Sequence, residues 1–175
     1  MTFKRTKTEE AWSGEMFKVR VDTVRFDDNG EEAEREIAEH PGAVAVFAHD
    51  GESFYLVAQP REAVGAQRLV ELPAGKLDEE GEEPLDTAKR ELAEEIGKGA
   101  RTWEHLATFW TSPGFSNERV LIYMATDLFD SQAEAEEHER INVLCRPLSE
   151  LDEAIAECSD SKSLIGMLWF KAYKS

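Results

Sequence analysis

Residues 84–97 read PLDTAKRELAEEIG, and this stretch has the strongest helical signature in the chain. Its apolar residues recur at spacings of three and four, which places them on one face of an α-helix. These residues are Leu85, Ala88, Leu92 and Ile96. Pro84 suits the first helical position, and Gly97 suits the C-terminal cap. The sequence therefore predicts a helix over residues 84–96.

The same helix carries three glutamates close together. Glu91 and Glu95 are four residues apart and project side by side, and Glu94 borders the same face. Such carboxylates repel one another unless a divalent cation such as Mg²⁺ binds between them. The alternative is a solvated acidic face on which Arg90 and Glu94 form an ordinary surface pair, and for an isolated ExxxE pattern this alternative is the commoner one. The apolar face lies opposite, so we expect the carboxylates to point outward into a cleft.

Around this helix the hydrophobic pattern predicts several strands and two further helices. A turn at residues 49–51 favours a buried hairpin of residues 43–48 and 54–58. The other strands are expected at 17–26, 34–39, 68–72, 102–110, 119–125 and 140–145, and the helices at 148–156 and 161–173. This order predicts an α/β protein in which a mixed sheet is sandwiched by helices.

Composition narrows the possible partners. The 175 residues include 37 acidic and 20 basic side chains, a formal charge of −17, which disfavours binding to nucleic acid and to anionic membranes. An acidic chain that handles a phosphorylated substrate must reverse the field locally, with metal ions or a few arginines. We find no apolar run of membrane-spanning length and expect no secretory signal. Cys145 and Cys158, expected to be buried, suggest no disulfide framework, so we expect a cytoplasmic protein.

The residues before and within the helix resemble the Nudix box, GX5EX7REUXEEXGU, in which U is a bulky aliphatic residue. The match holds at Gly75, Glu82, Arg90, Glu91, Leu92, Glu94, Glu95 and Gly97. Two departures are present: six residues, 76–81, separate Gly75 from Glu82, and Lys98 replaces the final aliphatic residue. A loop absorbs one extra residue at small entropic cost, so the resemblance stands.

The resemblance implies an α/β/α Nudix sandwich with a mixed sheet, and it implies roles for the matching residues. Glu91 and Glu95 would ligate Mg²⁺, or alternatively Mn²⁺, with the Ala74 carbonyl as a backbone ligand. Glu94 would lie nearby, and Arg90 and Glu82 would orient the carboxylates. Bound metal would neutralise a pyrophosphate and lower the pKa of a bound water.

Further segments look like the ADP-ribose pyrophosphatase subgroup of this family. Residues 112–116 (SPGFS) resemble its S-P-G segment, residues 35–44 (REIAEHPGAV) its R-E-x-x-x-H-P-G-A-V strand and turn, and residues 59–61 (QPR) its Q-Y-R. The implied substrate-binding residues are Arg35, Arg61, Ser112, Pro113 and Glu118. The alternatives are a simple turn at Pro113 and ordinary surface charges at the two arginines.

A general base is also required, and the subgroup places a glutamate in the loop before the strand at 140–145. By the spacing E-x-E-x-I-x-V, the resemblance implies Glu137 as the base and Glu139 as a metal ligand. Most of the acidic run around them is expected to be a solvated loop.

The resemblance thus implies metal-dependent hydrolysis of a nucleoside-diphosphate sugar, with ADP-ribose giving AMP and ribose 5-phosphate as the leading case. Another nucleotide sugar, a dinucleotide, or a non-catalytic nucleotide-binding module are the alternatives. We expect residues 41–175 to form the Nudix hydrolase domain. Residues 1–40 are expected to form an antiparallel strand segment that, by resemblance, joins two copies into a homodimer.

Overall fold

The computed structural model describes residues 2–131 and 141–174. The chain forms two compact units. One unit comprises residues 1–42 and 109–119, and the other comprises residues 43–108 and 120–175. No helix in the described ranges combines the length and the apolar character that crossing a bilayer requires.

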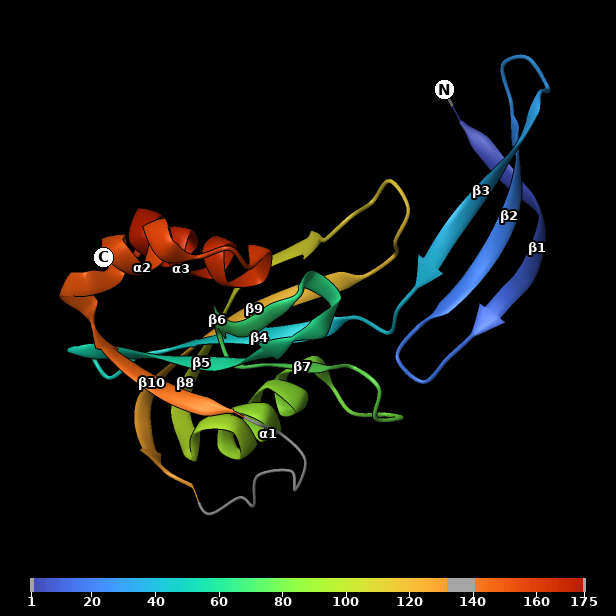
Figure 1. Ribbon diagram of the computed structural model, residues 1–175. Coiled ribbons are helices and arrows are strands. Elements are labelled where there is room, and N and C mark those ends of the chain that lie inside the picture. The colour runs from blue at the N-terminus through green and yellow to red at the C-terminus, as the bar shows by residue number, and fades with distance from the viewer. Residues whose placement is uncertain (1, 132–140, 175) are drawn as a thin grey trace. The chain divides into compact units, whose positions relative to one another are not determined.

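The first unit is built on a three-stranded antiparallel sheet in the order β1-β2-β3 (Figure 1). The strands are β1 (Phe3–Ser13), β2 (Lys18–Phe26) and β3 (Glu32–Glu39). β2 and β3 agree with the expected strands, whereas β1 was not predicted. All eleven residues of β1 are exposed and many are charged, so the strand lacks the apolar alternation that identifies a half-buried one. The segment 109–119 joins this unit through a bridge between Ala38 and Ser116.

The second unit contains two sheets. One is antiparallel, in the order β10-β5-β6, and the other is mixed, in the order β7-β4-β9-β8, with β4 parallel to β9. The strands are β4 (Ala43–Ala48), β5 (Ser53–Arg61), β6 (Ala66–Glu71), β7 (Ala74–Lys76), β8 (Lys98–Trp110), β9 (Arg119–Asp130) and β10 (Asn142–Pro147).

Helices cover both faces of these strands, as Figure 1 shows. α1 (Pro84–Ile96) packs against β4 and β7, while α3 (Ser161–Tyr173) packs against β4 from the other side together with α2 (Leu151–Glu157). Two short 3₁₀ turns, η1 (Glu62–Val64) and η2 (Leu148–Glu150), complete the unit. The predicted α/β class with a mixed sheet between helices is confirmed, and so are the predicted bounds of α1 and α3.

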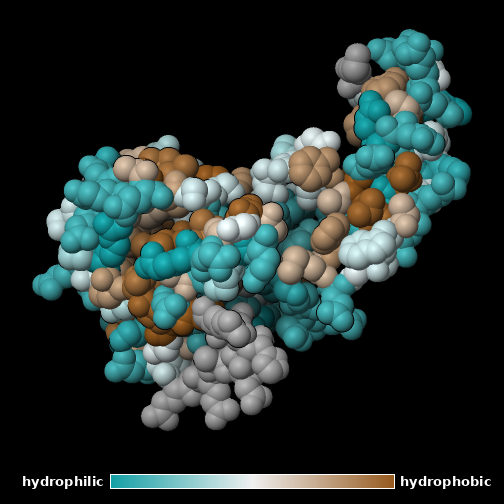
Figure 2. Space-filling view, in the orientation of Figure 1, coloured by the Kyte–Doolittle hydropathy of each residue, from teal (hydrophilic) through white to brown (hydrophobic). Residues whose placement is uncertain are grey.

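The surface of the protein is largely hydrophilic on the face shown in Figure 2. Apolar residues lie in smaller groups between the hydrophilic ones. The first unit nevertheless exposes several large apolar side chains, among them Phe3, Trp12 and Met16.

The predicted hairpin of residues 43–48 and 54–58 is wrong. β4 and β5 lie in different sheets, and only an isolated bridge from His49 to Phe54 connects their ends. β4 is almost entirely buried, and β5 is buried along most of its middle. A strand buried on both faces reads as a continuous apolar run, which predicts a strand but not its partner. The expectation of two buried cysteines also fails, because Cys145 is exposed and Cys158 is partly buried.

Candidate active site

α1 places the predicted acidic cluster beside β7. Leu92 and Ala88 are fully buried against the core, and Gly97 closes the helix in the left-handed conformation with φ 67°. Glu95 is only 7% exposed and accepts a 2.8 Å hydrogen bond from the Ala74 backbone amide. The expectation that all three carboxylates point outward is therefore wrong for Glu95. Position 95 follows Leu92 by three residues, so it lies at the edge of the apolar face.

Arg90 ties the remaining carboxylates together. Its Nη1 donates to Glu91 Oε1 at 2.9 Å and to Glu94 Oε2 at 3.0 Å. Its Nε and Nη2 donate to the two oxygens of Glu82 at 3.3 and 3.2 Å. Hydrogen bonds to Glu82 are the main reason that the Arg90 pKa is raised. The same contact, with a bond from Thr87, lowers the pKa of Glu82, so both groups are charged.

The extra residue before Glu82 lies in a turn. Residues 78–81 are mostly exposed, and Gly81 takes a φ of 82° with open space where a side chain would project. Glu82 nevertheless reaches Arg90, eight residues further on. The lengthened loop thus brings together the two residues that the box predicts as neighbours.

At Gly75 the backbone of β7 lies against the Glu91 side chain of α1. A Cβ atom at this position would lie 1.9 Å from both Cδ and Oε1 of Glu91. Real Cβ contacts are essentially never below 3.0 Å. A glycine is therefore required here if the Glu91 carboxylate is to lie against the backbone of residue 75.

These residues fit a hard divalent cation by their chemistry and by the space they share. The carboxylates of Glu91 and Glu95 meet two successive residues of β7, Gly75 and Ala74, so oxygen donors gather at one short stretch of backbone. Within residues 2–131 and 141–174, no three acidic, His or Cys side chains already form a ligand group. Mg²⁺ commonly uses one or two carboxylates and completes its shell with waters and substrate phosphates, so a full protein cage is not required.

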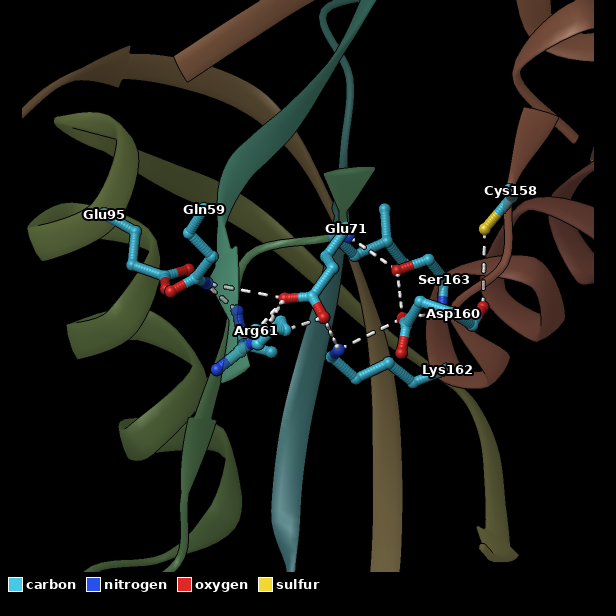
Figure 3. A network of polar contacts seen from close by, with 10 residues as sticks. Gln59, Arg61, Glu71, Glu95, Cys158, Asp160, Lys162 and Ser163 are labelled. Carbon is cyan, nitrogen blue, oxygen red and sulfur yellow. Dashed lines mark hydrogen bonds and ion pairs between the residues drawn. The ribbon is translucent and has the colours of Figure 1, made fainter. Parts of the chain in front are cut away.

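Arg61, at the end of β5, belongs to a polar network that Figure 3 shows between Glu95 of α1 and the first residues of α3. Its Nη2 donates to Oε2 of the buried Glu71 at 2.6 Å, and its Nε lies 3.1 Å from both oxygens. Lys162 contacts the same carboxylate at 3.4 Å. Sequence reasoning gave Glu71 and Lys162 no role of their own. A buried acidic residue at a strand end is a signal, but its burial was not visible in the sequence.

Four other predicted substrate-binding residues lie in the first unit, and two of them share a pocket. Arg35 and Pro113 line a cavity of about 540 Å³ together with Arg5, Arg20 and Phe26. The Arg35 guanidinium lies 6.0 Å from the centre of the Phe26 ring. Arg5 and Arg20 are paired with Asp22 of the same lining at 3.5 and 3.2 Å. Arg35 beside the Phe26 ring is therefore the feature that suits a ligand combining negative charge with a flat apolar face.

Ser112 and Glu118 do not line this pocket. The Ser112 carbonyl accepts hydrogen bonds from the amides of Phe115 and Ser116, so Pro113 sits in a tight turn, as the alternative interpretation expected. The Glu118 carboxylate accepts a bond from Thr111 at 2.7 Å and lies 3.7 Å from His40 Nδ1. The predicted base Glu137 and metal ligand Glu139 lie outside the described residues.

Comparison with known proteins agrees with this geometry. The NUDIX domain family matches residues 39–164, so the chain belongs to the Nudix family, and the prediction of a Nudix pyrophosphohydrolase is confirmed at the level of the family. Over 142 residues the chain is 42% identical to an ADP-ribose pyrophosphatase from Mycobacterium tuberculosis, covering 81% of this chain and 68% of the relative.

A second relative covers more of the chain. A methanol dehydrogenase activator from Bacillus methanolicus is 38% identical over 172 residues, which covers 96% of this chain and 92% of the relative. Among solved structures, an ADP compounds hydrolase matches with a TM-score of 0.86 at 19% identity, covering 99% of this chain and 94% of that one. That structural match supports the fold.

Proposed function

We propose that this protein hydrolyses the pyrophosphate bond of a nucleoside-diphosphate sugar with the help of Mg²⁺, and that ADP-ribose is its leading substrate. The products would be AMP and ribose 5-phosphate. The observation that carries the proposal is the carboxylate cluster that Arg90 holds together, with Glu91 against Gly75 and Glu95 bonded to Ala74. The identity to a relative that is itself an ADP-ribose pyrophosphatase supports the choice of substrate.

The chain's own residues have distinct tasks in this proposal. A bound divalent cation would supply charge neutralisation and a water of lowered pKa. Glu91 and Glu95 would hold that cation, and Arg90 keeps Glu91 and Glu94 aligned. In the reaction, a water oxygen bonds to one phosphorus and the bridging P–O bond breaks. The water's proton passes to a base, for which Glu137 remains the proposal from the sequence.

Recognition of the rest of the substrate is proposed for the arginines. The negative charge of Glu95 contributes to the raised pKa of Arg61, and Figure 3 shows both side chains in the same view, which supports a role for Arg61 beside the carboxylate cluster. Arg35 and Pro113, which line the pocket of the first unit, are also proposed to bind substrate, as are Ser112 and Glu118. We also propose that residues 1–40 mediate homodimerisation, which sedimentation velocity at micromolar concentration would measure.

A second candidate function follows from the relative that covers 96% of the chain. That protein is a methanol dehydrogenase activator, so this chain is also a candidate regulator of a dehydrogenase. Such a role does not exclude hydrolysis. Assays of a purified alcohol dehydrogenase with and without the protein and Mg²⁺ test it directly.

A substrate panel tests the main proposal. Purified protein is incubated with ADP-ribose, a second nucleotide sugar and a dinucleotide, each with Mg²⁺, with Mn²⁺ and with chelator, and the products are identified by ³¹P NMR. We expect AMP and ribose 5-phosphate from ADP-ribose, and no products with chelator. Preference for another substrate would reassign the specificity, and a protein inert toward the whole panel would overturn the proposal.

A further inference from the structure

Glu71, the last residue of β6, has a buried carboxylate that contacts two basic side chains, those of Arg61 and Lys162. Its side chain is 3% exposed. Arg61 donates to it through Nε and Nη2, and Lys162 Nζ lies 3.4 Å from Oε1. Burying a charge is costly unless it is paired and hydrogen-bonded, and Glu71 satisfies this condition from both sides. Figure 3 shows the carboxylate between the two basic side chains.

The contact fixes the orientation of Arg61. Glu71 engages two of the three guanidinium nitrogens, so the planar group is held by one edge, and Nη1 lies outside the contact. The Arg61 side chain is 41% exposed. Burial alone would lower the Arg61 pKa, but the Glu71 contact, with a smaller effect of Glu95, raises it, so the group stays charged. Arg61 therefore presents a fixed positive edge near the acidic cluster.

The contacts of Lys162 connect secondary-structure elements and do not orient Arg61. Lys162 Nζ also contacts Asp160 at 3.0 Å, and Asp160 caps α3 by accepting from the Ser163 amide at 3.0 Å. The Ser163 hydroxyl in turn accepts a 2.7 Å bond from the Leu72 amide. This group of contacts attaches the start of α3 to the end of β6 and includes no direct contact with Arg61 among the described residues.

We propose that Glu71 is a positioning residue, which holds the Arg61 guanidinium in the orientation that binds the phosphates of the substrate, while Lys162 uses the same carboxylate for stability alone. The inference rests on the proposed function, because it takes the phosphates to lie at the Glu91–Glu95 cluster. Arginine binds oxyanions through a planar fork, so a fixed orientation lowers the entropy that binding must overcome.

The decisive comparison is between Glu71→Gln and Lys162→Met. Glutamine keeps the size of Glu71 but loses its charge and the two-sided contact with Arg61. We expect Glu71→Gln to raise KM for ADP-ribose about tenfold with a smaller change in kcat, since Arg61 would bind ground state and transition state alike. Lys162→Met leaves the Arg61–Glu71 contact in place, so we expect a lower Tm with KM unchanged. Equal KM effects in both variants would overturn the proposal.

Two further variants separate positioning from general damage. In an Arg61→Gln background, adding Glu71→Gln should change KM by less than about twofold, because residues that act through one contact are not additive. Independent, additive effects would overturn the inference. Arg61→Lys keeps the charge without the fork and should raise KM about tenfold even if Glu71→Gln does not fold. An Arg61→Lys variant with wild-type KM would also overturn it.

A binding measurement distinguishes this inference from the proposed function. Calorimetry with inorganic pyrophosphate and Mg²⁺ requires no hydrolysis. Weaker binding by Glu71→Gln, but not by Lys162→Met, supports the positioning role even if the wild type hydrolyses no nucleotide sugar. Equal binding by wild type and Glu71→Gln removes the positioning role even if hydrolysis is observed.

Discussion

Replacing Gly75 with alanine should inactivate the protein while leaving it folded. The added Cβ would lie 1.9 Å from the carboxylate of Glu91, and ordinary contact begins at 3.4 Å, so the carboxylate must move by the difference, about 1.5 Å. The atoms in the way belong to the far end of a flexible side chain, and the backbone at residue 75 has an ordinary φ. We therefore expect the Glu91 side chain to change its conformation while the backbone fold stays the same.

The expected magnitudes follow from that displacement. Misplacing a catalytic group by about 1 Å can reduce the rate on the order of 100-fold, so we expect kcat for ADP-ribose to fall at least that far. A changed Glu91 rotamer costs about 1 kcal/mol, and the reduced freedom of alanine in the unfolded chain offsets part of it. For a chain of this size that corresponds to a Tm change within about 4 °C.

The assay compares kcat, its Mg²⁺ dependence and Tm for wild type, Gly75→Ala and a matched control. Gly14→Ala is that control, because its Cβ would lie 2.1 Å from the Trp12 ring in the turn between β1 and β2. We expect this equally tight substitution to leave kcat unchanged. A folded Gly75→Ala protein with a kcat within about threefold of wild type would refute the placement of Glu91 in the site.

Three other changes have defined outcomes. Glu95→Gln should retain Tm, because an amide oxygen still accepts from Ala74, yet lose turnover; unchanged Mg²⁺-dependent kinetics would contradict the assignment. Arg90→Lys should lower kcat about 10- to 100-fold, because one ammonium group cannot hold the carboxylates of Glu82, Glu91 and Glu94 together. If magnesium activates the variant as it activates the wild type, this role of Arg90 is wrong. Burial lowers the pKa of His49, despite an opposing effect of Asp50. The unfolded chain therefore binds a proton at this residue below about pH 6.5 before the native state does, and the free energy of unfolding falls as pH drops towards the lowered pKa. His49→Phe should lack this pH dependence. Urea denaturation of both proteins at about pH 7.5 and about pH 5.5, on either side of the ordinary histidine pKa, measures the free energy of unfolding. An equal decrease in this free energy for wild type and variant would disprove the prediction.

Local signals in the sequence predicted the helices well. Pro84 and Gly97 mark the two ends of α1, and the apolar spacing between them identifies its buried face. β1 was not predicted, because a fully exposed strand lacks the alternation of apolar and polar residues that identifies a strand in the sequence. The pairings of β4 with β9 and of β5 with β10 were also missed, since these strands are largely buried and each pairing joins residues distant in the chain.

The candidate site likewise contains residues that the sequence predicted and residues that it did not. The box residues could be located from their spacing, including Glu82 beyond an extra loop residue. The Glu71 network could not, because its members meet only after folding, as the bond from Leu72 to Ser163 across 91 residues illustrates. The burial of Glu95 was missed as well, because its neighbours in β7 do not belong to the helical pattern that predicted it.

The polypeptide on either side of Pro73 is anchored to two different helices: the Leu72 amide donates to Ser163 on α3, and the Ala74 amide donates to Glu95 on α1. One short link thus connects α3 with the helix that carries the Glu91–Glu95 cluster. Trimming α3 away, or fusing a bulky tag that pries it loose, would release the first anchor and loosen the strand that carries the second. Anyone shortening this protein for expression should therefore check turnover as well as solubility.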